Sequence, residues 1–144
     1  MVSSLYTPVL VVHVLVAVLG LGLIASVAVL AATARKVGRG STDISAWLGP
    51  LLRYSALSLA AMLVTGVLLD IVTGGAFHEA WWFRGSALLL IVTGVLHAQA
   101  RRVVRLRFAK EDSGDVVLRR VERIARGMCM LIAAITVLME VKPF

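Results

Sequence analysis

Long stretches without acidic or basic side chains divide the chain into four apolar segments. Among His, Lys, Arg, Asp and Glu, the first segment contains only His13, the third contains only His97, and the other two contain none. Leu, Val, Ala, Ile and Gly fill most of each segment. The segments are bounded by charged residues at positions 35, 53, 70, 84, 101, 126 and 140.

The length of each segment predicts a membrane-spanning helix. A helix rises about 1.5 Å per residue, so about 20 residues cross the roughly 30 Å hydrocarbon core. The first three segments reach this length, and an apolar stripe before residue 126 extends the fourth. We therefore expect an all-α, four-helix transmembrane bundle forming a single domain over residues 1–144. The expected helices cover about 7–34, 50–73, 81–106 and 117–140.

Composition agrees with a membrane protein. Of the 144 residues, 60% are hydrophobic and 16% are charged, against about 45–50% and about 25% in typical soluble domains. This balance, with a mean hydropathy of +0.94, excludes a soluble enzyme, and the apolar content excludes a disordered chain. Cys129 is the one cysteine, which excludes an internal disulfide and a cysteine-rich metal site.

Basic residues concentrate in two connecting regions. Residues 35–53 carry four basic residues against one acidic residue, and residues 101–126 carry nine against four. Because positively charged loops stay in the cytoplasm, we expect both termini outside a bacterial cytoplasmic membrane. The net charge of +7 then reflects topology and attraction to anionic lipid. The expected partner is the lipid bilayer, and nucleic acid is not expected.

His13 is the first candidate for chemistry. Ala17 and Gly20 share its helix face at i+4 and i+7, and faces of small residues pack against other helices. An ionisable residue inside a membrane is a functional hypothesis by default. The alternative, an imidazole hydrogen-bonded to a neighbouring carbonyl or hydroxyl, stays open.

A polar seam marks the third segment. Ser86, Thr93 and His97 fall at i, i+7 and i+11 on one helix face. Such a seam in an apolar helix is expected to face protein or a cavity. For His97, a functional role and an interfacial position facing headgroups both remain open.

Depth in the membrane separates the two histidines. Their positions along parallel helices place His13 and His97 about 10 Å apart in depth, so we do not expect one iron to join them. Met139 and His78 are candidate partners for His13, since Met and His are both axial haem ligands. Arg84, at a depth near that of His13, is either a partner for a propionate or an interfacial anchor.

One short internal echo concerns helix packing. Residues 64–68 read Val-Thr-Gly-Val-Leu, and residues 92–96 repeat them. A relic of an inverted repeat is one interpretation, and Thr-Gly pairs that permit close packing are the favoured one. We expect Gly20, Gly66 and Gly94 to lie at helix contacts.

The chain resembles the HemJ-type protoporphyrinogen oxidases, small four-helix membrane proteins that bind haem. The resemblance rests on Val11-Val12-His13-Val14 in the first helix, on the spacing of Trp82 and His97, and on the closing Val141-Lys142-Pro143-Phe144. The first helix is also similar to that of CopD-like copper-resistance membrane domains. The resemblance implies haem b at His13. Where the family carries a functional Lys this chain has Ser86, so oxidase activity stays open.

Two functions follow as hypotheses. The first is a haem-b-binding membrane protein, redox-active or related to an oxidase, with a cofactor site formed by His13, His97, Arg84 and Met139 and with His13 as iron ligand. The second is a non-catalytic accessory subunit that packs against other membrane subunits or against further copies of itself. The sequence names no substrate, redox partner or host complex.

Overall fold

Four helices form the whole of the described structure apart from one short loop. A computed structural model of the protein describes residues 2–37, 41–107 and 114–141. The helices are α1 (Val2–Val37), α2 (Ser41–Val72), α3 (Trp81–Arg107) and α4 (Gly114–Val141). Each contains a stretch long and apolar enough to cross a membrane. The all-α, four-helix fold is therefore confirmed, and the chain is an integral multi-pass membrane protein.

Two helices begin well before the positions predicted from the sequence. Helix α1 starts at Val2 rather than near residue 7, and α2 starts at Ser41 rather than near residue 50. Pro50 lies inside α2, where it removes one backbone donor. Ile44 and Leu48, which precede it, are buried in the apolar core. Their packing offsets the cost of the proline, because tertiary packing supplies most helix stability.

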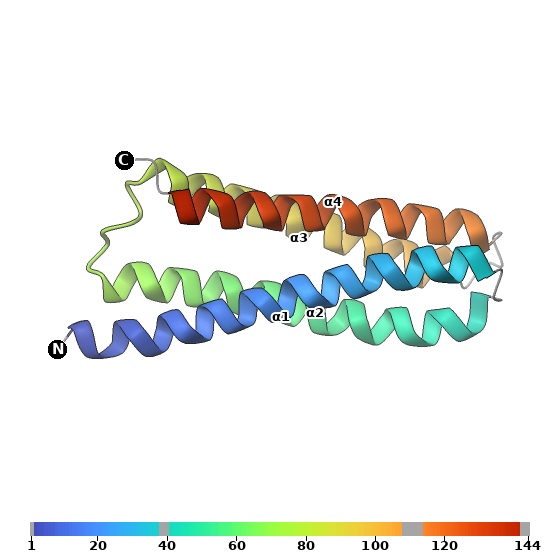
Figure 1. Cartoon of the computed structure of the whole chain (residues 1–144), viewed down its shortest axis with the longest axis horizontal. Coiled ribbons are helices and arrows are strands. Elements are labelled where there is room, and N and C mark those ends of the chain that lie inside the picture. The colour runs from blue at the N-terminus through green and yellow to red at the C-terminus, as the bar shows by residue number, and fades with distance from the viewer. Residues whose placement is uncertain (1, 38–40, 108–113, 142–144) are drawn as a thin grey trace.

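The helices run alternately up and down, so the start of α1 and the end of α4 lie at the same end (Figure 1). We call this the open end and the opposite one the closed end. Helices α1 and α2 form one pair, α3 and α4 form the other, and the two pairs diverge toward the open end (Figure 1). Most of the buried apolar core belongs to the closed half, including Val27, Ala31, Leu48, Val103 and Val121.

A buried carboxylate joins α1 to α4 in the closed half. Glu122 is only 4% exposed, and its Oε2 accepts a hydrogen bond from Arg35 Nε at 3.2 Å. Arg126, one turn further along α4, donates to the other carboxylate oxygen. The negative charge thus has two cationic partners, as a buried charge requires.

The loop between α2 and α3 lies at the open end and connects the two helix pairs. Gly74 and Gly75 adopt φ values of 73° and 81°, a left-handed conformation that glycine adopts without steric cost. Asp70 Oδ1 then accepts the backbone N–H groups of Phe77 and His78 at 2.9 and 3.0 Å. The carboxylate therefore fixes where the loop turns back toward α3.

A histidine-lined cavity as candidate functional site

The divergence of the two helix pairs leaves a cavity in the open half. It has a volume of about 470 Å³ and is lined by all four helices, among them His13, Met62, Phe83 and Met139. An adjoining space of about 90 Å³ shares these four residues and adds Ser86. Binding sites for small molecules and cofactors are typically apolar cavities of about 300–1,000 Å³. The larger cavity has that size and character.

One hydrogen bond fixes the imidazole of His13 at the wall of this cavity. The ring nitrogen Nδ1 lies 2.7 Å from Thr65 Oγ1 on α2. The Thr65 hydroxyl donates its single proton to the Ala61 carbonyl at 2.8 Å, a common bond for threonine inside a helix. With its proton donated to Ala61, the oxygen accepts from Nδ1–H of His13, which is the tautomer assigned to the ring here. This tautomer leaves Nε2 with a free lone pair.

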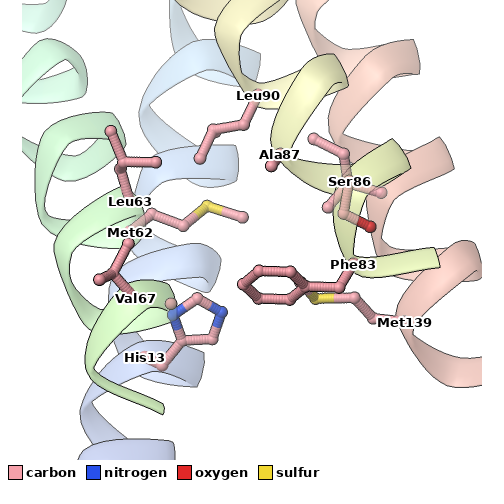
Figure 2. A pocket seen from close by; sticks show the side chains of 11 residues that line it. His13, Met62, Leu63, Val67, Phe83, Ser86, Ala87, Leu90 and Met139 are labelled. Carbon is pink, nitrogen blue, oxygen red and sulfur yellow. The ribbon is translucent and has the colours of Figure 1, made fainter. Parts of the chain in front are cut away.

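The free nitrogen faces the cavity. Figure 2 shows the His13 ring turned so that its second nitrogen points toward Phe83 and Met139. Within the described residues Nε2 forms no hydrogen bond. A histidine whose Nδ1–H is held by a neighbouring oxygen and whose Nε2 is free has the arrangement of a metal-ligating histidine. His13 of α1 and Met139 of α4 line the same space, and the Phe83 ring lies between them in Figure 2.

Ser86 is a second polar residue at the wall of the same space. Ser86 is 2% exposed. Its buried hydroxyl has no hydrogen-bond partner in the described part of the chain. Figure 2 shows it on α3, across the cavity from His13. A buried hydroxyl without a partner costs about 1–3 kcal/mol. Figure 2 shows the hydroxyl oxygen turned toward α4, away from His13, so the unpaired group lies behind the cavity wall.

His97 does not line the cavity beside His13. It is buried, and its Nε2 lies 2.8 Å from Ser55 Oγ on α2. Ser55 precedes Thr65, the partner of His13, by ten residues, which is about 15 Å along a helix. The two imidazoles therefore do not share a site. The expected burial of the seam formed by Ser86, Thr93 and His97 is confirmed.

The remaining predicted residues lie at the loop. Arg84 is exposed, and its Nε donates to the His78 carbonyl at 2.8 Å. The His78 ring is exposed and lies 3.8 Å from Asp70 Oδ2. Neither residue lines the cavity beside His13. Among the residues that the structure describes, no group of three or more His, Cys, Asp or Glu side chains is arranged to hold a metal ion.

The glycine predictions have mixed outcomes. A Cβ built on Gly20 would lie 3.3 Å from Ser58 Cβ, and one on Gly66 would lie 3.6 Å from His13 Cε1. Both glycines thus lie at the α1–α2 contact, as predicted. The prediction for Gly94 is wrong, because a Cβ there would meet nothing within 4 Å. Gly94 instead lines an opening of about 260 Å³ between α2 and α3.

Two contributors to the cavity, Thr65 and Met62, and the separate partner of His97, Ser55, were not predicted from the sequence. Thr65, part of the pentapeptide repeated at 64–68 and 92–96, orients His13. Ser55 holds His97. Met62 contributes a sulfur to the cavity wall. A usable signal existed for Thr65 and Ser55, since a hydroxyl side chain inside an apolar helix often bonds to another helix.

Comparison with models of known protein families, with curated proteins and with solved structures finds no match for this chain. The resemblance to HemJ-type oxidases therefore depends on the residues that carry it in the sequence. What the chain binds has to be argued from the cavity itself.

Proposed function

We propose that the protein binds haem b in the open-half cavity, with His13 as an axial ligand of the iron. The observation that carries the proposal is the free Nε2 of His13, directed into an apolar cavity of about 470 Å³. An apolar wall suits the macrocycle, and neutral imidazole is the commonest protein ligand of haem iron. The resemblance to HemJ-type oxidases supports the same assignment.

The other residues of the cavity have supporting roles in this proposal. Thr65 holds the His13 ring in one orientation and one tautomer, which is what an outer-shell partner does for a metal ligand. Met139 lines the same cavity from α4 and would be the second residue to hold the iron. Arg84 still has guanidinium N–H groups beyond the one bonded to His78, and these are the proposed partners of a propionate.

Redox activity is the second part of the proposal. A bound haem supplies one-electron chemistry, and the protein sets its potential through the axial ligands and the polarity of the surroundings. His97 is hydrogen-bonded to Ser55 about 15 Å further along α2. It is therefore assigned no part in holding the same iron.

A visible spectrum of the protein purified in mild detergent tests the proposal. We expect a Soret band in the wild type at near-stoichiometric haem, its loss in His13→Ala, and its retention in the matched control His97→Ala. Both variants remove one buried imidazole, so a general effect of such a loss appears in both. Unchanged haem content in His13→Ala overturns the ligand assignment. A colourless wild-type protein that co-purifies with a larger complex favours the accessory-subunit alternative instead.

A further inference from the structure

A second cavity, remote from His13, lies between α2 and α3 in the closed half. Its volume is about 650 Å³. Helix α2 contributes Gly49 and Leu52, and α3 contributes Ala98, Arg101, Arg102, Val104, Arg105 and Leu106. A Cβ on Gly49 would meet nothing within 4 Å, so the glycine leaves the groove open on its α2 side. We call this space the arginine groove.

Positive charge dominates the groove. Arg101, Arg102 and Arg105 all line it, and no acidic side chain does so in the part of the chain that the structure describes. All three arginines are exposed, and none forms an ion pair with another described residue. Arg35 and Arg119, at the same end, are by contrast paired with carboxylates. The three groove guanidiniums therefore keep their full capacity to bind an anion.

The groove lies at the depth of lipid headgroups. Arg101 follows Trp81 by twenty residues, so about 30 Å of α3 separates the two, which is the thickness of the hydrocarbon core. Trp81 is exposed at the opposite end of the helix, where membrane-interface tryptophans lie. The arginines thus reach the headgroup level while Leu52 and Ala98, toward the membrane centre, form an apolar floor.

We propose that the arginine groove binds one anionic phospholipid, with the lipid phosphate held by the guanidiniums and an acyl chain lying on the apolar floor. Guanidinium groups bind phosphate oxygens in bidentate fashion. Basic pockets between transmembrane helices at the cytoplasmic side are suited to lipid headgroups. The combination of three cations without an acidic partner among the described residues and an apolar floor favours a lipid over a free phosphate ester, which needs only the cations.

Titration of the detergent-solubilised full chain with lipid, followed by native mass spectrometry, tests the site. The probes are phosphatidylglycerol, phosphatidylcholine with the same acyl chains, and glycerol 1-phosphate. We expect wild type to prefer phosphatidylglycerol over the other two. The double variant R101Q/R105Q should bind phosphatidylglycerol about thirtyfold more weakly, because each arginine near an anionic surface contributes about 1 kcal/mol.

Two further variants separate a site from diffuse attraction. R120Q/R123Q removes the same charge from exposed, unpaired arginines of α4 that do not line the groove, and its affinity should stay within about twofold of wild type. Gly49→Leu keeps every arginine but fills the groove from α2, and should also weaken binding. Equal weakening in R120Q/R123Q overturns the proposal. Equally tight binding of glycerol 1-phosphate overturns the assignment to a lipid.

Discussion

The Nδ1 atom of His13 and the hydroxyl oxygen of Thr65 lie 2.7 Å apart although 52 positions separate the two residues along the chain. The bond crosses from α1 to α2 at the level where the helix pairs diverge. It satisfies a polar group on each of two apolar helices and decides which nitrogen of the imidazole faces the cavity. The interaction is therefore both a structural contact and the device that orients the candidate ligand.

Replacing Thr65 tests whether its hydrogen bond orients the His13 ring. Thr65→Val keeps the shape of the side chain and removes the acceptor, leaving a buried N–H without a partner at a cost of about 1–3 kcal/mol. We expect a lower free energy of unfolding and a lower haem content at fixed haem supply. Thr65→Ser keeps the hydroxyl and should stay near wild type in both measurements. Equal haem content in the Val and Ser variants would show that the bond does not orient His13.

Ser86→Ala should have opposite effects on stability and binding. Removing a buried hydroxyl without a partner relieves a cost of about 1–3 kcal/mol, so the ligand-free protein should become more stable. If a bound molecule reaches this hydroxyl, the same change removes a hydrogen-bond donor from it, and the haem dissociation rate should rise. Unfolding by titration with a denaturing detergent measures the first effect, and transfer of haem to a scavenging protein measures the second. A stability equal to or below that of wild type contradicts the first expectation.

Glu122 should matter far more than a carboxylate on the surface. Glu122→Gln leaves Arg35 and Arg126 without their anion, and hydrogen bonds to charged groups contribute about 1.5–3 kcal/mol. Asp115→Asn breaks the exposed pair with Arg119, for which we expect a loss of less than about 1 kcal/mol. Unfolding measurements on the two variants give the comparison. Similar losses would mean that burial of Glu122 adds nothing to its interaction.

The α1–α2 contact is expected to reject a larger side chain at Gly20. Gly20→Leu forces side-chain atoms against Ser58, and overpacking typically costs about 1–3 kcal/mol. Gly22→Leu introduces the same residue two positions later, where no atom lies within 4 Å. It should be tolerated and benefit from the better helix propensity of leucine. Equal yields of folded monomer for the two variants on size-exclusion chromatography would refute the close contact.

Orientation in the membrane can be read from cysteine labelling in intact cells. In a Cys129→Ser background, cysteines at Ser41 and Gly114 should resist a membrane-impermeant reagent, because they lie within the basic regions expected in the cytoplasm. A cysteine at Glu79, an exposed residue of the loop between α2 and α3, should react. Reaction at 114 with protection at 79 would reverse the assignment of both termini to the outside.

The apolar segments were sufficient to predict the fold, because a segment that crosses a membrane has to satisfy all its backbone hydrogen bonds internally, as a helix does. The same segments could not predict that α2 starts at Ser41, since proline and glycine at 49–50 resemble a helix boundary. Packing of Leu48 in the core overrode that local signal. Helix starts depend on tertiary contacts that a local pattern does not contain.

The candidate site was predictable residue by residue but not as an assembly. Burial of His13 and Ser86 followed from their helix faces, and those faces are local properties. Which residue meets His13 depends on the rotation and relative height of α2, so Thr65 could not be named in advance. The burial of Glu122 could not be predicted for a related reason. It lies within a run of arginines, and only the contact with α1 shows it to be buried.

The divergence of the helix pairs also decides how a ligand reaches His13. Val14 and Val18 of α1 line the cavity and are also 51% and 64% exposed on the surface of the protein. Exposed positions along a spanning helix face the acyl chains of the lipid. A molecule can therefore arrive sideways, from the lipid, between helices that are already apart. Its occupancy then depends on how strongly it dissolves in the bilayer rather than on its concentration in water. For the proposed haem, a sparingly soluble macrocycle, the membrane itself would then be the reservoir from which the protein is loaded.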